Sequence, residues 1–269
     1  MKFKDYRRYL KPRARDAHKG NFGRLLVIGG DVGLMGAPRI ASMGAARVGA
    51  GLVTCATRDE HDEFMSVEYP EIMNLGVIST EELAEKIEDS TVVVIGPGLG
   101  KSPWSEAKYN TVIATTKPMV LDADALNQLA KAPQHRDHWI LTPHPGEAAR
   151  LLETDVDVIQ RDREAAIKKL QEKYGGVIVL KGAGTLVINQ HGDIKKCTAG
   201  NPGMASGGMG DLLAGIIGGL LAQGLPADVA AECGVCLHAE AGDLSAKRDG
   251  ERGMLATDLL PFIRKLANP

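Results

Sequence analysis

Apolar and polar positions along the chain predict strands and helices in alternation. Short apolar runs rich in β-branched residues are typical of strands that are buried on both faces of a parallel sheet. Such runs occur at residues 24–29, 52–56, 91–95, 119–121, 139–141 and 177–181. Two later runs, at 185–188 and 194–197, are preceded by turns at Gly184 and at 191–193 and predict short antiparallel strands.

Longer segments between these runs have the composition of helices. Ser79 and Glu82 are spaced as a capping box at the start of one of them. We expect helices at 37–50, 79–88, 104–115, 125–131, from about 146, and at 157–174, 208–223, 227–246 and 257–266. Strands alternating with helices predict an α/β fold, a three-layer sandwich with a mostly parallel central sheet and helices on both faces. No linker, repeat or low-complexity segment divides the chain, so we predict one domain over residues 1–269.

Composition and charge exclude several classes of protein. The chain is 44% hydrophobic and 25% charged, which is typical of a globular protein. A formal net charge of -2 gives no reason to expect a nucleic-acid partner or a membrane surface, and 4% aromatic residues argue against base-stacking platforms. No apolar run approaches the roughly 20 residues of a membrane span. The basic segment 1–19 lacks the apolar stretch of a signal peptide, so we expect a cytoplasmic protein.

The four cysteines do not indicate a metal or redox site. Cys233 and Cys236 form a C-x-x-C pair inside an apolar, helical segment. A zinc site needs a second pair of ligands, and a redox pair needs a turn between a strand and a helix. We interpret both cysteines as small core residues.

Polar or glycine-rich turns follow five of the predicted strands. They lie at 29–33, 96–100, 122–124, 142–147 and 181–185. Ligands of open α/β sheets bind at the carboxyl ends of the strands. The five turns therefore predict a large composite pocket at one edge of the sheet.

Two of these turns have the character of ligand-binding loops without matching a known motif. The glycines of 96–102 are one residue too close for a P-loop, and the third comes too early for a dinucleotide-binding turn. This turn either faces a ligand or is simply tight. The turn at 181–185 is either a plain hairpin or a phosphate site, because Lys181 precedes exposed backbone N–H groups.

The turns at 122–124 and 142–147 also allow two interpretations. Asp122 and Asp124 could cap the helix that begins near Ala125, and this role suits Asp124 better. His144 lies between two prolines and is either a ligand-binding residue or an ordinary turn residue in a rigid loop.

Residues 200–211 form the strongest candidate for a reaction centre. Gly207-Gly-Met-Gly-Asp211 opens an apolar helix. The unpaired N–H groups of a helix N-terminus attract anions, and glycines let a phosphate approach the backbone. Asp211 alone could merely complement the helix dipole. Together with the glycines, it indicates an anion hole beside a catalytic base.

The chain resembles the ADP/ATP-dependent NAD(P)H-hydrate dehydratases, a branch of the ribokinase-like superfamily. The matching segments follow the order of the family and are 19–23, 29–31, 49–53, 95–100, 120–127, 141–147, 180–185 and 200–211. Ser206 stands where a threonine is common, which retains the hydroxyl. Some members carry an additional epimerase domain, and a chain of 269 residues fits the dehydratase alone.

The resemblance implies a ribokinase-like fold and a repair reaction. Hydrated NADH or NADPH, as the S epimer, would be phosphorylated on its ring hydroxyl and would then lose phosphate to restore the double bond. Phosphate, with a second pKa of about 6, leaves far more readily than hydroxide, whose conjugate acid has a pKa of about 15.7. ADP would become AMP and phosphate; ATP is the other candidate donor, and Mg²⁺ is implied. The family often forms homotetramers.

The resemblance also implies a role for each matching residue. Asp211 would be the general base and would contact substrate, and the backbone of Gly208, Met209 and Gly210 would hold the transferring phosphoryl group. Lys181, Gly182, Ala183, Gly184, Thr185 and Gly210 would bind the nucleotide. Ala37, Gly98, Gly100 and His144 would line the hydrate pocket. Glu147 would organise Mg²⁺ through water.

Two rival functions stay open at this point. One is a ribokinase-like kinase that acts on a vitamin-precursor alcohol. The other is a nucleotide-binding sensor without catalysis, for which a base at Asp211 would have no use.

Overall fold

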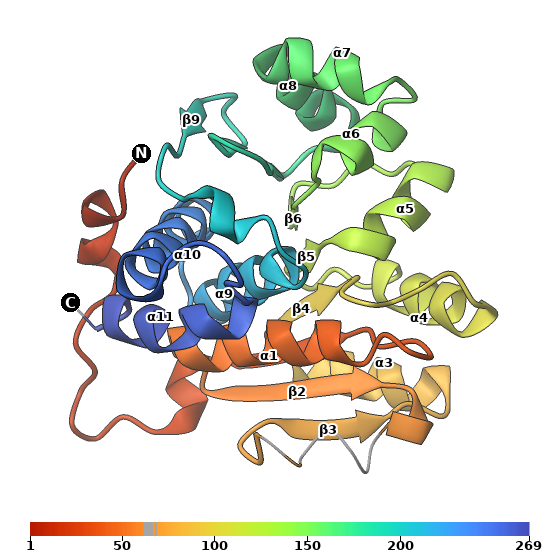
Figure 1. The fold of residues 1–269 in the computed structure, drawn as a ribbon. Helices are drawn as coiled ribbons and strands as arrows, with labels where there is room; N and C mark the ends of the chain where they lie inside the picture. The colour runs from red at the N-terminus through yellow and green to blue at the C-terminus, as the bar shows by residue number, and fades with distance from the viewer. Residues whose placement is uncertain (62–66, 68, 269) are drawn as a thin grey trace.

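A nine-stranded sheet runs through the structure, a computed structural model that describes residues 1–61, 67 and 69–268 (Figure 1). The strand order is β3-β2-β1-β4-β5-β6-β7-β8-β9. Neighbours from β3 to β7 are parallel, whereas β8 and β9 are antiparallel additions at one edge. The strands are β1 (Arg24–Ile28), β2 (Leu52–Thr57), β3 (Met73–Gly76), β4 (Val92–Ile95), β5 (Met119–Leu121), β6 (Trp139–Leu141), β7 (Val177–Leu180), β8 (Leu186–Ile188) and β9 (Ile194–Lys196).

Successive side chains of the central strands enter two different hydrophobic cores. Leu25 and Val27 of β1 pack into one core, and Leu26 and Ile28 pack into the other. This follows from the period of two along a strand. Strands that are buried on both faces must be apolar throughout, which is why continuous apolar runs predicted them.

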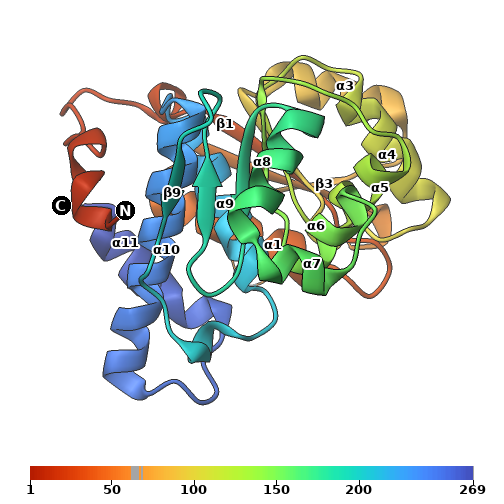
Figure 2. The ribbon, with the colours of Figure 1, turned by 90° about the horizontal axis from the view of Figure 1, so that it is seen from above.

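Helices cover both faces of the sheet (Figure 2). One layer consists of α1 (Gly36–Val48), α9 (Met209–Ala222), α10 (Ala227–Asp249) and α11 (Leu260–Leu266). The opposite layer consists of α3 (Thr80–Asp89), α4 (Pro103–Ile113), α5 (Ala123–Lys131), α6 (Pro145–Leu151), α7 (Val156–Arg161) and α8 (Arg163–Tyr174). The expected α/β class, a three-layer arrangement with a mostly parallel sheet, is confirmed.

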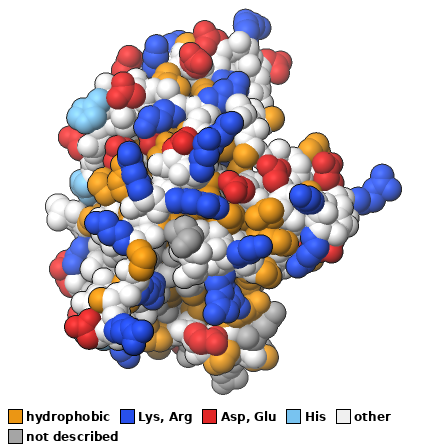
Figure 3. Space-filling model, turned by 90° about the vertical axis from the view of Figure 1, so that its left-hand side faces the viewer, with side chains coloured by type: hydrophobic (Ala, Val, Ile, Leu, Met, Phe, Trp, Pro, Cys, Tyr) orange, Lys and Arg blue, Asp and Glu red, His pale blue; other side chains and the backbone are white. Residues whose placement is uncertain are grey.

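Short 3-10 helices complete the fold, and the first two belong to an N-terminal segment packed beside α10. They are η1 (Phe3–Asp5), η2 (Arg7–Tyr9), η3 (Lys19–Phe22), η4 (Asp59–His61), η5 (Pro202–Met204) and η6 (Ala256–Leu259). Both termini lie on the same side of the molecule (Figure 1), and Lys and Arg side chains are spread over that face among apolar ones (Figure 3).

Three elements of the structure differ from the sequence prediction. The strand β3 was not expected. The helix expected at 157–174 is two helices, because Asp162 leaves helical geometry at φ -142° and caps α8 by accepting the N–H of Ala165. The segment 257–266 begins as the 3-10 helix η6 and becomes α-helical at Leu260.

Two smaller expectations concern caps and cysteines. Ser79 caps α3 by accepting the N–H of Glu82, but the Glu82 carboxylate accepts from Ile78, so the capping box is not completed. Cys233 and Cys236 are buried in the middle of α10, which fits their interpretation as core residues.

Among the described residues, no helix is both long enough and apolar enough to cross a membrane.

Candidate active site

The five predicted turns lie at one edge of the sheet. They follow β1, β4, β5, β6 and β7, which are parallel and adjacent in this order. Their backbones pack against one another, so that a Cβ on Gly96 would lie 1.7 Å from the carbonyl oxygen of Asp122. Gly96 also has φ +128°, which favours glycine. Close contact between neighbouring turns therefore explains part of the glycine content.

A lysine shared by acidic side chains lies in the middle of this edge. Lys181 Nζ is 2.6 Å from Asp122 Oδ1 and 3.8 Å from Glu147 Oε2. Thr142 donates its hydroxyl to the same Asp122 oxygen at 2.8 Å. Burial by itself lowers the pKa of Lys181, but Asp122 and Glu147 raise it above its ordinary value. Lys181 is therefore a permanent cation at neutral pH.

The N-terminus of α9 abuts this cluster. Gly208 is the N-cap residue at φ +88°, and Met209, Gly210 and Asp211 form the first turn. A Cβ on Gly210 would lie 3.2 Å from Lys181 Nζ and 3.8 Å from Asp122 Oδ2. The structure thus brings the glycine-rich helix start and the lysine together.

Asp211 has the properties of a base rather than of a simple dipole partner. Burial raises the pKa of Asp211 to about 6, with further upward contributions from Asp122 and Asp124 and an opposing one from Lys181. An ordinary aspartate titrates near 3.9. A pKa of about 6 still leaves the group mostly ionised at pH 7 and brings it closer to the range of effective general bases.

The loop before α9 is anchored to α10. The Asp243 carboxylate accepts the N–H of Gly200 at 2.9 Å and the amide of Asn201 at 3.0 Å. Asn201 in turn accepts the N–H of Gly203 and caps η5. These bonds fix the path of the chain that leads to Asp211.

The segment Lys181–Thr185 is the turn of the β7–β8 hairpin. Its position is set by the Arg163 guanidinium, which donates to the carbonyls of Leu180 and Lys181. Thr185 closes the turn by donating its hydroxyl to Gly182. Gly184 has φ +71°, as a tight turn requires. The segment is a hairpin that lies beside Gly210, so the plain and the ligand-binding interpretations are compatible.

Ala37, Gly98 and Gly100 lie on the other part of the edge. A Cβ on Gly98 would lie 3.1 Å from Ala37 Cβ, so these two are neighbours. The N–H of Gly100 donates to Asp124 Oδ2 at 2.9 Å. The expectation that Asp124 caps the following helix is therefore wrong. Helix α5 begins at Ala123 without a side-chain cap, because Asp122 is engaged by Lys181 and Asp124 by the Gly100 turn.

His144 and Glu147 form a capping box at the start of α6. The ring Nδ1 of His144 accepts the N–H of Gly146, and the Glu147 carboxylate accepts the N–H of His144 at 2.7 Å. Burial and the charge of Lys181 lower the pKa of His144, so the imidazole is neutral at pH 7. Burial raises the pKa of Glu147 to about 7, against the opposing effect of Lys181.

The acidic groups do not form a preassembled metal cage. Within the described part of the chain, no group of three or more His, Cys, Asp or Glu side chains is placed to hold a metal. Glu147 and Asp122 already have partners. The site therefore fits only a cation held chiefly by water and phosphate, which is a mode that Mg²⁺ uses.

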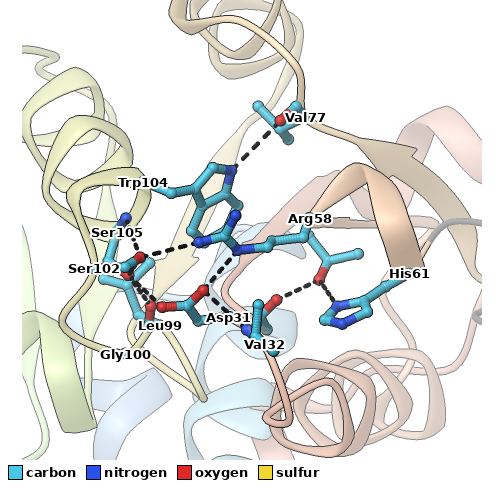
Figure 4. Close-up of polar contacts among 12 residues, drawn as sticks. Asp31, Val32, Arg58, His61, Val77, Leu99, Gly100, Ser102, Trp104 and Ser105 are labelled. Atoms are coloured by element: carbon cyan, nitrogen blue, oxygen red, sulfur yellow. Dashed lines mark hydrogen bonds and ion pairs between the residues drawn. The ribbon is translucent and has the colours of Figure 1, made fainter.

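The sequence interpretation missed a polar network beside Gly98 and Gly100 (Figure 4). Its centre is Asp31, whose carboxylate is paired with Arg58 at 2.6 Å. Asp31 lay within a predicted turn and could have been noticed as an acidic residue among glycines. Arg58 gave no signal, because it is 27 residues from its partner. The anchor Asp243 was missed for the same reason.

Comparison with known proteins matches residues 25–265 to the NAD(P)H-hydrate dehydratase family model. A bifunctional NAD(P)H-hydrate repair enzyme of Coxiella burnetii is 57% identical over 97% of the chain, which covers 53% of that protein. The chain thus spans about half the length of the curated relatives it first matches. An ADP-dependent (S)-NAD(P)H-hydrate dehydratase of Neisseria meningitidis is 41% identical over 96% of the chain and 89% of that protein.

A solved structure agrees with these matches. The ADP/ATP-dependent NAD(P)H-hydrate dehydratase of Bacillus subtilis, co-crystallised with ATP and Mg²⁺, superposes with a TM-score of 0.86. The two chains are 28% identical, and the match covers 98% of this chain and 95% of the other. The ribokinase-like fold expected from the sequence is confirmed.

Proposed function

Because the chain belongs to the NAD(P)H-hydrate dehydratase family, we propose that it dehydrates the S epimer of hydrated NADH or NADPH at the expense of ADP. The observation that carries this proposal is Asp211, a partly buried carboxylate in the first turn of α9 beside Lys181. It supplies a base next to a phosphate-binding helix start, which is what phosphorylation of an alcohol needs.

Asp211 removes the proton from the ring hydroxyl of the hydrate. The oxygen then attacks the terminal phosphorus of ADP, a new oxygen–phosphorus bond forms, and the bridging bond to AMP breaks. In the second half of the reaction, the carbon–oxygen bond breaks with release of phosphate, the neighbouring ring carbon loses its proton, and the double bond returns. The products are the reduced dinucleotide, AMP and phosphate.

The start of α9 stabilises the phosphoryl group during transfer. The backbone N–H groups of Gly208, Met209 and Gly210 lie at the N-cap and in the first turn of a helix, where they have no carbonyl partner within the helix. Dipoles that are already oriented toward developing charge stabilise it without reorganisation. Lys181 adds a fixed cation close to this turn, because a Cβ on Gly210 would lie 3.2 Å from Lys181 Nζ.

The nucleotide binds along Lys181–Thr185, and the hydrate binds beside Ala37, Gly98, Gly100 and His144. Support comes from their arrangement: Lys181–Thr185 follows β7, Gly98 and Gly100 follow β4, and Asp211 lies near Asp122 and Asp124, which follow β5 between those strands. His144 follows β6, next to the strand of Lys181. The neutral His144 imidazole suits a position near a nicotinamide ring.

Mg²⁺ would accompany the nucleotide, with Glu147 contacting it through water. When bound, it would neutralise phosphate charge. The relative of known structure was crystallised with ATP and Mg²⁺, and Glu147 and Asp122 place carboxylates at this edge beside Lys181. A homotetrameric state and a cytoplasmic location also remain predictions.

A repair assay tests the function directly. The protein is mixed with hydrated NADH and either ADP or ATP, and absorbance at 340 nm is followed together with release of AMP or ADP. Recovery of absorbance with stoichiometric phosphate release is expected, and we expect ADP to be the better donor. A kinase acting on a vitamin-precursor alcohol would consume nucleotide only with that alcohol. A sensor would bind nucleotide without turnover.

A further inference from the structure

A partly buried ion pair lies outside the groups that the proposed function uses (Figure 4). Arg58 donates from Nε to Asp31 Oδ1 at 2.6 Å, and its guanidinium lies 5.2 Å from the centre of the Trp104 ring. Asp31 is 8% exposed. Burial by itself raises the pKa of Asp31, but hydrogen bonds from Ser102, the Val32 N–H and Arg58 lower it to about 2. The carboxylate is therefore charged at neutral pH.

This pair joins strand ends that are separated in sequence. Asp31 follows β1 and Arg58 follows β2. Arg58 also donates to the hydroxyl of Ser102 at 3.2 Å, and Ser105 donates to Asp31 Oδ2 at 3.2 Å and to the carbonyl of Leu99. Both serines follow the Gly96–Gly100 turn at the end of β4, so the network ties that turn to the ends of β1 and β2.

The network meets the turn at the two glycines assigned to the hydrate pocket. The N–H of Asp31 donates to the carbonyl of Gly98 at 2.7 Å. A Cβ on Gly100 would lie 2.5 Å from Asp31 Oδ2, so the carboxylate packs directly on that residue. On its other side, Gly100 donates its N–H to Asp124. The turn is thus held between two carboxylates, neither of which is free to move alone.

We propose that Asp31, fixed by Arg58, is a positioning residue that sets the shape of the hydrate pocket by holding Gly98 and Gly100. This inference rests on the proposed function. It predicts a selective effect, because the nucleotide segment Lys181–Thr185 follows β7, which is three strands away from β4. Disturbing the pair should weaken binding of the hydrate and leave binding of ADP unchanged.

The experiment compares Asp31→Asn and Arg58→Gln with the wild-type protein. We expect the KM for hydrated NADH to rise about tenfold in Asp31→Asn, because a charged hydrogen bond is lost and the glycine turn relaxes. The KM for ADP and kcat should stay within about twofold. Calorimetric binding of hydrated NADH without nucleotide should show the same weakening. Arg58→Lys keeps the cation and should recover part of the loss seen in Arg58→Gln.

Glu232→Gln is the matched control. Glu232 is 2% exposed and is paired with Lys195 at 2.8 Å, and it lies on α10, away from the turn at Gly98. The Glu232→Gln substitution removes a comparable buried charge. It should therefore lower the Tm and leave the KM for hydrated NADH and the KM for ADP unchanged. Arg58→Gln serves if Asp31→Asn does not fold, because Arg58 is 21% exposed.

Two results would overturn the inference. In the first, the KM and the Kd for the hydrate stay within twofold of wild type in both variants while the Tm falls. This result would show that the Asp31–Arg58 pair only stabilises the fold. The other is an equal rise in the KM for hydrate and for ADP. A wild-type protein that turns over no hydrate contradicts the proposed function instead.

Discussion

At the scale of single residues, the site is defined by one cation surrounded by carboxylates. Lys181 interacts with Asp122, Glu147 and Asp211, and its pKa is raised by all three. The cluster is therefore negative before any nucleotide arrives. The phosphate binding that we propose there requires that the start of α9, and a cation carried with the nucleotide, offset this charge. Burial is the main cause of the raised pKa of Asp211, and the neighbouring carboxylates of Asp122 and Asp124 add to it.

Replacing Asp211 with Asn should abolish turnover while ADP still binds. General-base catalysis is worth about 10²–10⁴ in rate, and the amide cannot accept the hydroxyl proton. Because the pKa of Asp211 is about 6, kcat/KM of the wild-type protein should fall about tenfold per pH unit below that value and level off above it. Steady-state kinetics between pH 4.5 and 8 check both points. Comparable activity in the variant would rule out the general-base role.

The same substitution should stabilise the fold at alkaline pH. The pKa of Asp211 is higher in the folded protein, at about 6, than in the unfolded chain, at about 3.9. Ionised Asp211 therefore costs stability, increasingly between about pH 4 and pH 6 and fully above that, and Asp211→Asn removes a cost of the order of 3 kcal/mol. The Tm difference between variant and wild type should be positive at pH 8 and vanish near pH 4. A constant difference across this range would show that titration of Asp211 is not its cause.

Lys181 and Asp122 should behave as a coupled pair. Lys181→Met leaves Asp122, which is 1% exposed, without its counter-ion, and such a loss costs about 3–5 kcal/mol. Adding Asp122→Asn should restore much of that stability. The KM for ADP should stay high in the double variant, since neutrality returns but the lysine donor does not. The wild type, the two single variants and the double variant form a double-mutant cycle, which denaturant unfolding and nucleotide kinetics measure. Additive changes in the free energy of unfolding would contradict the coupling.

At the scale of elements, α1 and α9 approach each other unusually closely. Helix α9 carries Gly215, Gly218 and Gly219 in its middle. A Cβ on Gly215 would lie 1.9 Å from the carbonyl oxygen of Ala41 in α1, and one on Gly219 would lie 2.9 Å from Ala45 Cα. The glycines let the two backbones pack in contact, and this packing fixes where the N-terminus of α9 meets the sheet edge.

Gly215→Ala should therefore destabilise the protein although alanine is the better helix former. Helix propensity alone predicts a gain of about 1 kcal/mol. The clash with backbone atoms of α1, which cannot move freely, should outweigh this and give a net loss of about 3 kcal/mol. Gly36→Ala in α1 is the control, because a Cβ there meets nothing within 4 Å. Thermal unfolding should show a lower Tm only for Gly215→Ala; equal shifts would show that propensity dominates.

The elements that the sequence predicted well are those whose signal is local. The continuous apolar runs of β4 and β7 identify strands buried on both faces, and the ends of these strands located the site. The strand β3 escaped because it is short and polar in part, with Met73 43% exposed. The break at Asp162 escaped because no glycine or proline marks it. Pairs such as Asp31 with Arg58 depend on which strands become neighbours, so no local pattern predicts them.

At the scale of the whole molecule, charge is distributed unevenly. Residues 1–19 contain eight Lys and Arg and two Asp, a formal charge of +6, so the remaining chain carries -8 of the total -2. This basic segment nevertheless packs against the rest of the fold. Tyr6 donates to the buried Glu232, which Lys195 also contacts, and the N-terminal amine donates to the carbonyl of Lys196. The Glu232 carboxylate on α10 and the Lys196 carbonyl on β9 thus hold the segment in place.

Phe3 should be the main anchor of this segment, and its loss should lower the stability of the entire fold. Its side chain is 1% exposed and lies in the same core as α10 and α11, on which the position of the Asp243 anchor depends. Phe3→Ala should cost about 3–5 kcal/mol in the free energy of unfolding. Lys4→Ala, at an exposed neighbour, should change it by less than about 0.5 kcal/mol. Denaturant unfolding, monitored by circular dichroism and by the repair assay, should show one shared transition shifted in Phe3→Ala. An unchanged midpoint would mean that the segment is held by its charges and not by its apolar side chains.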